Sequence, residues 1–139
     1  MIFMTTYTHL IARAALQVRP KRLVHGLIGD VGCALQTMSG VIYTARCVFT
    51  DSNTICAERA AIASMVSAGD EYRIALIVAV WRDEAGTLFV IPPCGHCRQA
   101  MHDIDPDNIQ HTRVVLDADR AVSLAELLPY HDWWQKQPT

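Results

Sequence analysis

The sequence predicts a three-layer α/β/α domain with a mixed five-stranded sheet. Segments typical of helices and of strands alternate along the chain, and glycine or proline separates most of them. An almost unbroken apolar run at 73–81 is typical of a central strand that is covered on both faces. The chain has 139 residues, 51% of them hydrophobic, which is enough for one core. We therefore expect a single domain over residues 1–139.

The first third of the chain predicts a helix and a hairpin. A helix is expected over 7–18, where apolar residues recur at helical spacing and Pro20 follows closely. Strands are expected over 27–36 and 41–48. The residues at 37–40, Thr-Met-Ser-Gly, have the composition of the turn that would join these two strands.

The middle of the chain predicts a helix, the central strand and a shorter strand. Residues 55–68 are rich in alanine, Thr54 stands where an N-cap belongs, and Gly69 follows the last turn. The apolar strand at 73–81 comes next. A short strand is expected at 89–91, and the two prolines that follow it end the strand.

The last third predicts a helix, a strand and a helix. The helix covers 94–104 and Pro106 lies just beyond it, while the strand covers 112–116. Ser123 is placed to cap a final short helix that ends near Leu128. Helices and strands in this order predict a mixed sheet between two helical layers.

Charge and hydropathy argue against several classes of partner. The formal net charge is −2 and the pI is about 6.3, and we interpret the basic residues Arg19, Lys21 and Arg22 as a solvated loop. We expect neither nucleic acid nor a membrane as a partner. No apolar run approaches the roughly 18 residues of a membrane span, and polar residues at 5–9 interrupt any signal peptide. A cytoplasmic location is therefore expected, where clustered thiols indicate metal binding or catalysis rather than disulfides.

Three cysteines stand at two expected helix starts. One segment reads Cys56-Ala57-Glu58, and the other contains the pair Cys94 and Cys97 in a Cys-x-x-Cys spacing. If both helices lie on one face of the sheet, their N-termini can converge on one point. Three thiolates with a fourth position open are the ligand set of a catalytic zinc, whereas a structural zinc site closes that position. The pattern therefore predicts a zinc ion that lowers the pKa of water.

Glu58 and Arg59, which follow Cys56 closely in the sequence, complete the chemistry of this site. Three thiolates leave zinc with a net charge of −1, which opposes acidification of water. The positive ends of the two helices counter this charge, and Arg59 can donate to a ligand sulfur. Glu58 lies too close to Cys56 in sequence to be a ligand from the same turn, so it is expected to carry protons to and from the substrate.

These segments resemble the cytidine deaminase superfamily, above all its small homotetrameric members. The similar stretches are 54–59 and 93–99 around the cysteines, 31–35 in the first long strand, and 126–129 near the C-terminus. The resemblance implies a homotetramer with zinc as cofactor, and hydrolysis of a cytosine-type nucleoside or base to its uracil counterpart with release of ammonia. The substrate is a small molecule.

The resemblance also implies roles for individual residues. It implies that Cys56, Cys94 and Cys97 bind zinc and that Glu58 transfers protons. The remaining implied roles are polarisation of the base by the backbone N–H of Ala57, and support of the thiolates by Arg59 and Gln99.

Cys47 and Phe49 depart from the family pattern. Cytidine deaminases usually present an Asn-x-Glu pair to the ribose hydroxyls, and the matching positions here carry Cys47-Val48-Phe49. An apolar site binds a ribose poorly, which favours a modified nucleoside or a free base over ordinary cytidine. The chain is similar here in length to blasticidin S deaminase, in which an aromatic residue matches Phe49. Cys47, Phe49 and Trp133 are candidates for contact with the substrate.

Several alternatives stay open at this point. The substrate can be a cytosine nucleoside antibiotic such as blasticidin S. The three cysteines can form a structural zinc site within an interaction module whose pocket has degenerated. Cys94-Gly95-His96-Cys97 also matches a redox dithiol, although Cys56-Ala57-Glu58 has no use in such a protein. Trp133 can equally pack against the core.

Overall fold

The computed structural model describes residues 7–132 and 136–139. Its helices are α1 (Thr8–Ala15), α2 (Ala57–Ala68), α3 (Gly95–Ile104), α4 (Asn108–His111) and α5 (Leu124–Leu127). Its strands are β1 (Lys21–Leu23), β2 (Gly26–Thr37), β3 (Ile42–Thr50), β4 (Thr54–Ile55), β5 (Ile74–Arg82), β6 (Leu88–Ile91), β7 (Arg113–Asp117) and β8 (Arg120–Ser123). Among the helices so described, none has the length and hydropathy needed to cross a membrane.

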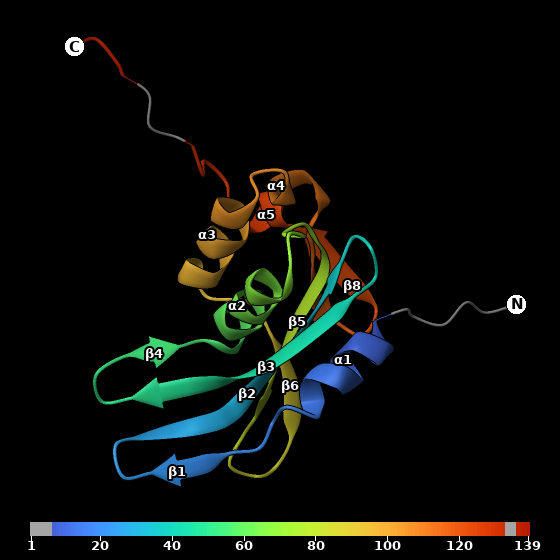
Figure 1. The fold of residues 1–139 in the computed structure, drawn as a ribbon, viewed down its shortest axis with the longest axis vertical. Coiled ribbons are helices and arrows are strands. Elements are labelled where there is room, and N and C mark those ends of the chain that lie inside the picture. Colours follow the sequence, from blue (N-terminus) through green and yellow to red (C-terminus); the bar gives the residue numbers. More distant parts are fainter. Residues whose placement is uncertain (1–6, 133–135) are drawn as a thin grey trace, which may run out of the picture.

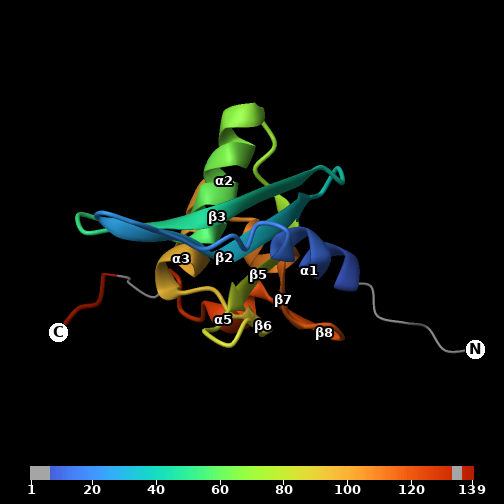
Figure 2. The same ribbon diagram turned by 90° about the horizontal axis from the view of Figure 1, so that it is seen from below.

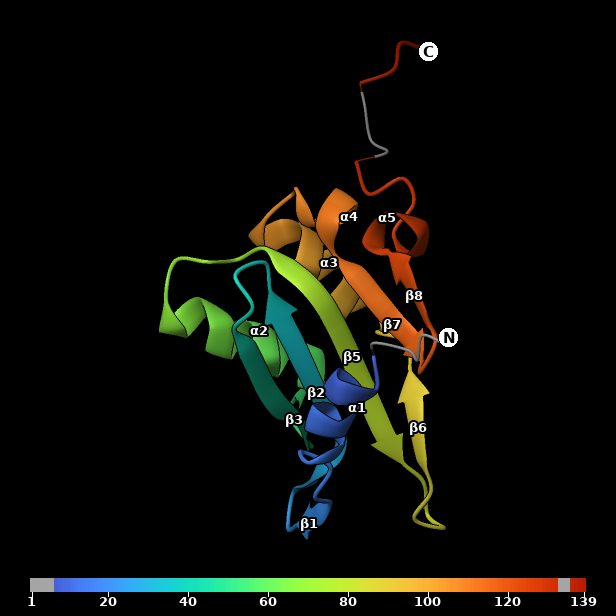
Figure 3. The same ribbon diagram turned by 90° about the vertical axis from the view of Figure 1, so that its right-hand side faces the viewer.

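The strands form one mixed sheet between two helical layers. The order along the sheet is β4-β3-β2-β5-β7-β8, with β1 paired to β2 and β6 paired to β5. β5 and β7 are parallel, and the remaining pairs are antiparallel. α1 covers one face of the sheet, whereas α2 and α3 lie on the opposite face (Figures 1, 2 and 3). This arrangement confirms the expected α/β/α class.

The sheet has eight strands rather than the five that were expected. β2, β3, β5, β6 and β7 correspond to the predicted strands, and β1, β4 and β8 are additional. The additional strands have only three, two and four residues. Such segments are too short to show an alternating pattern, and they form because a longer neighbour offers unpaired backbone groups at its edge.

Residues on β2 and β5 alternate between two cores. One core lies beneath α2 and α3 and contains Cys33, Leu35, Ile77 and Ala79. The other lies beneath α1 and contains Ala34, Val78 and Val80. β5 is therefore covered on both faces, as the continuous apolar run at 73–81 predicted.

Two local expectations were wrong. The basic segment around Pro20 is not a simple loop, because Lys21–Leu23 forms β1 against β2. Thr54 does not cap the alanine-rich helix, because it belongs to β4 and pairs with Phe49 of β3. The N-cap of α2 is Cys56, whose extended backbone ends β4 and starts the helix. Ser123, in contrast, caps α5 as expected by accepting from the backbone N–H of Glu126.

Asn108 links its own helix α4 to the start of β5 and to α3. It is fully buried, accepts from the N–H of Ile74 at 2.9 Å, and donates to the carbonyls of Tyr72 and Met101 at 3.1 and 2.8 Å. We expect Asn108→Ala to lower the free energy of unfolding by about 2–4 kcal/mol, because three backbone groups, two of them buried, lose their partner. Urea denaturation measures the loss, and the exposed Gln110→Ala on the same helix should change it by less than about 0.5 kcal/mol.

Candidate metal centre and active site

The two helix starts bring three sulfurs together. Cys56 is the N-cap of α2 and Cys94 is the N-cap of α3, while Cys97 lies in the first turn of α3. The Sγ atoms of Cys56 and Cys94 are 3.6 Å apart, and those of Cys94 and Cys97 are 3.5 Å apart. Within residues 7–132 and 136–139, Cys56, Cys94 and Cys97 form the one group of three or more His, Cys, Asp or Glu side chains that could hold a metal ion. Their potential ligand atoms all lie within 4.8 Å of one another. All five cysteines are free thiols.

These distances fit a zinc ion rather than a disulfide. A disulfide needs an S–S distance of about 2.05 Å. A tetrahedral zinc with Zn–S bonds of about 2.3 Å places its sulfurs about 3.8 Å apart, close to the spacing found here. Three cysteines also leave the fourth tetrahedral position free, which is the arrangement that catalytic zinc requires.

The electrostatics of the cluster favour a bound cation. Burial raises the pKa of Cys97, and the nearby charge of Glu58 raises it further. Burial also raises the pKa of Cys56, although Arg59 opposes this effect. For Cys94, burial acts upward too, but the backbone N–H groups of Cys97 and His96 help to bring its pKa below the usual value. Three thiols this close cannot all ionise unless positive charge is placed among them.

Glu58 lies in the first turn of α2, one residue after Ala57. Its side chain is almost completely buried, with 4% of its surface exposed, and it lines the same cavity as Cys56 and Cys94. Burial raises the pKa of this carboxyl above its usual value. A carboxyl with a raised pKa exchanges protons more readily near neutral pH, which suits a general acid and base.

Arg59 supports the sulfur cluster from outside. Its Nη2 donates to the carbonyl of Thr54 at 3.0 Å and contacts the Sγ of Cys56 at 3.9 Å. The contact with sulfur is the one expected from the sequence. Gln99 is placed differently, because its amide nitrogen donates to Asp103 at 2.8 Å along its own helix. The structure therefore brings Arg59, but not the amide of Gln99, to the thiolates.

A small cavity of about 120 Å³ opens beside the sulfurs. Its lining contains two of the expected substrate contacts, Ala57 and Phe49, together with Cys56, Cys94 and Glu58. Sequence reasoning missed the remaining lining residues, Val31, Ile91 and Pro92. Pro92 could have been anticipated, since it lies two residues before a predicted ligand.

A third expected substrate contact, Cys47, does not line this cavity. Cys47 is fully buried, and its thiol donates to Asp30 at 2.9 Å instead of lining the space by the sulfurs. Trp133 lies outside the described residues.

Comparison with known proteins decides the family. The family model of the cytidine and deoxycytidylate deaminase zinc-binding region matches residues 7–112. The chain belongs to this family. It is accordingly a zinc-dependent hydrolytic deaminase that acts on the C–N bond of a cytosine.

Individual relatives agree with this placement. A cytidine deaminase from Halalkalibacterium halodurans is 30% identical over 123 residues, which cover 86% of this chain and 89% of that protein. Blasticidin-S deaminase from Bacillus cereus is 39% identical over 83 residues, but the match covers only 55% of this chain and 59% of that protein. The crystal structure of cytidine deaminase from Mycobacterium tuberculosis superposes with a TM-score of 0.70 and 25% identity, over 89% of this chain and 94% of that one.

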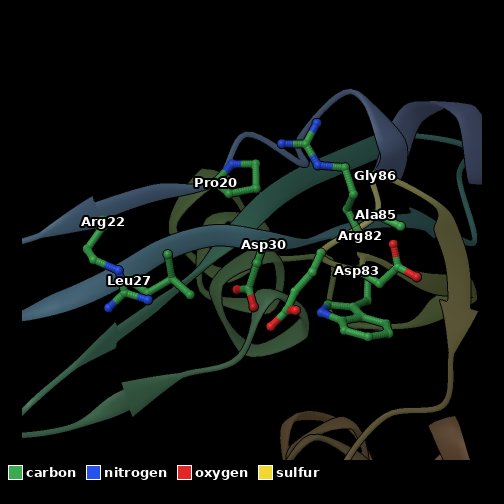
Figure 4. A pocket seen from close by; sticks show the side chains of 10 residues that line it. Pro20, Arg22, Leu27, Asp30, Arg82, Asp83, Ala85 and Gly86 are labelled. Carbon is green, nitrogen blue, oxygen red and sulfur yellow. The ribbon is translucent and has the colours of Figure 1, made fainter.

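A second, larger cavity lies outside the sulfur site. Its volume is about 550 Å³, and it lies between β1, β2 and the turn that joins β5 to β6 (Figure 4). Aromatic, acidic and basic side chains line it, among them Trp81, Asp30, Asp83, Glu84 and Arg82. No cysteine of the sulfur cluster is among the described residues that line it.

Proposed function

We propose that this deaminase converts a cytosine-type nucleoside or base to its uracil counterpart, with zinc held by Cys56, Cys94 and Cys97 and protons carried by Glu58. One observation carries the proposal. The buried carboxylic acid Glu58 shares the wall of one small cavity with Cys56 and Cys94, two of the three sulfurs that lie at zinc spacing. A structural zinc site has no use for such an acid or for a free coordination position.

Zinc, when bound, lowers the pKa of a water molecule so that this water becomes a nucleophile near neutral pH. The protein's own residues do the rest. Glu58 accepts a proton as the water oxygen attacks C4 of the ring, and it donates that proton to N3. The backbone N–H of Ala57, at the positive end of α2, polarises the ring carbonyl.

Glu58 also completes the reaction at the leaving group. The C4–N4 bond breaks as the carboxyl passes the second proton of the water to the amine, which leaves as ammonia. One water molecule is consumed, its oxygen stays on C4, and its two protons end on N3 and on ammonia. The raised pKa of Glu58 matches this alternation between base and acid.

The apolar wall of the cavity selects the substrate class. Phe49 and Val31 contribute to this wall, and Ile91 and Pro92 extend it. These side chains can hold a flat pyrimidine ring but give no hydrogen bonds to a ribose. A nucleoside antibiotic such as blasticidin S is the second candidate, because the Bacillus cereus blasticidin-S deaminase shares 39% identity over the matched stretch.

We also propose one domain over residues 1–139, a homotetramer and a cytoplasmic location. The family resemblance supports the tetramer. The exposed apolar side chains of Leu88 and Phe89 on β6 give an oligomer a surface to cover. Free thiols at a metal cluster suit a reducing compartment.

A substrate screen tests the activity. We expect the purified protein, loaded with zinc, to release ammonia from cytidine, deoxycytidine, 5-substituted cytosines or blasticidin S, with cytosine as the free-base comparison. Ultraviolet absorbance follows loss of the cytosine ring, and a coupled assay measures ammonia. Absence of turnover on every compound, in protein that contains zinc, would contradict the proposal and favour the interaction-module alternative.

A further inference from the structure

Asp30 and Cys47 form a polar pair that the deamination chemistry does not use. The Cys47 thiol donates to Oδ1 of Asp30, with a sulfur–oxygen distance of 2.9 Å. Burial, together with the hydrogen bond to Asp30, raises the pKa of Cys47 to about 11. The thiol therefore stays protonated at neutral pH. It remains a hydrogen-bond donor to the carboxylate and lies outside the sulfur cluster.

A β-bulge directs Asp30 toward the face of the sheet that carries the sulfurs. The register of β2 against β3 shifts within residues 28–32, and Gly29 has a φ of +76°, a conformation that favours glycine. In a regular strand the residue before Val31 would face the opposite side. Here Asp30 instead reaches Cys47, which belongs to the same core as Val31.

The cavity at Asp30 adjoins the cavity at the sulfurs. Val31 lines the sulfur cavity and pairs across the sheet with Trp81, which lines the larger cavity. Phe49 of β3 lines the sulfur cavity too, and it pairs across the sheet with Leu27 of β2, which lines the larger cavity. Cross-strand partners have Cα atoms about 4.5–5.5 Å apart, so the two spaces are neighbours. The smaller cavity has room for one pyrimidine ring, and a group attached to the ring extends beyond it.

The carboxylate of Asp30 has unused acceptor capacity. In the described parts of the chain, Cys47 is its only hydrogen-bonding or ion-pairing side chain. An ionised carboxylate offers about four acceptor positions. Arg82 lines the same cavity, but Figure 4 shows its guanidinium and the Asp30 carboxylate pointing in opposite directions. Arg22 lies beside Leu27, apart from Asp30.

We propose that Asp30, held by Cys47, determines specificity by accepting hydrogen bonds from donors on the N1 substituent of the cytosine. The donors are hydroxyl or ammonium groups, and Trp81 provides an apolar surface for the same substituent. This inference rests on the proposed function. Cys47 and Phe49 cannot bind hydroxyl groups as the Asn-x-Glu pair of related enzymes does, and Asp30 places a carboxylate one strand away from them.

Asp30→Ala tests the inference with two substrates. Cytidine carries hydroxyl donors on N1, whereas 1-methylcytosine carries none. We expect kcat/KM for cytidine to fall about 10- to 100-fold, mainly through KM, because the variant loses charge-assisted hydrogen bonds. The same parameter for 1-methylcytosine should change by less than about twofold. Asp119→Ala is the matched control, since it makes the same change at an exposed aspartate that lines neither cavity, and it should leave both substrates unaffected.

Asp30→Asn identifies the donor. Asparagine keeps an oxygen for Cys47 and for hydroxyl groups but loses the charge. If it largely restores turnover of cytidine, hydroxyl donors are supported; if it restores neither cytidine nor 5′-amino-5′-deoxycytidine, the negative charge is required and the inference also stands. Wild-type kinetics on cytidine in zinc-loaded Asp30→Ala, or an equal loss on 1-methylcytosine, would overturn the inference alone. If the wild-type protein turns over none of these compounds, the proposed function fails first.

Discussion

Glu58→Gln should abolish nearly all turnover while leaving the fold and the metal in place. Glutamine matches glutamate in shape but cannot accept the proton of the attacking water or deliver a proton to the leaving amine. General acid and base catalysis contributes about 10²–10⁴-fold, and the same group acts here at both steps, so we expect kcat to fall at least about 10³-fold. Steady-state kinetics measures the loss.

Three measurements make this result specific. Zinc content and circular dichroism should match the wild type, because Glu58 is not in the sulfur cluster. Glu126→Gln makes the same chemical change on the exposed first turn of α5 and should retain full activity. Appreciable turnover by Glu58→Gln would remove Glu58 from the proton-transfer role.

Cys94→Ser should strip the protein of zinc. The Sγ of Cys94 is within 3.6 Å of both other sulfurs, so its loss leaves two ligands that cannot hold the ion tightly. We expect the zinc content to drop from about one per chain to a small fraction of that value. Elemental analysis after dialysis measures the content, and deaminase activity should disappear with the metal.

Stability gives an independent readout of the same variant. Binding of a metal to the folded state stabilises that state, so chelation should lower the Tm of the wild type. Cys94→Ser should have a Tm near that of the chelated wild type and should not respond to the chelator. Cys33→Ala is the control, because Cys33 is a buried thiol of the same core outside the sulfur cluster, and this variant should keep its zinc. Full zinc content in Cys94→Ser would refute the ligand assignment.

The convergence of the sulfurs was predictable because its causes are local. Cys56 and Cys94 each stand at a helix start, and Cys97 follows Cys94 at the spacing of one helical turn. Once α2 and α3 lie on one face of the sheet, their N-termini need little further information to meet. Glu58 was predictable for the same reason, since its position in the first turn of α2 places it beside Cys56.

The strands that escaped prediction have causes that are not local. β1, β4 and β8 have four residues or fewer, and each exists because it pairs with a longer strand. Thr54 illustrates the effect. Its residue type suits an N-cap, but pairing with Phe49 of β3 draws it into β4 and leaves the cap to Cys56.

The sequence by itself predicted the ligand set and the proton carrier and indicated the family, because motifs at helix starts need only local geometry. Only the tertiary structure decided how Asp30 and Cys47 are used. No local motif links the two residues, and 17 positions separate them in sequence. A bulge in β2 and the packing of β2 against β3 bring the thiol to the carboxylate. Strand register and bulges depend on partners distant in the chain, so a local pattern cannot specify them.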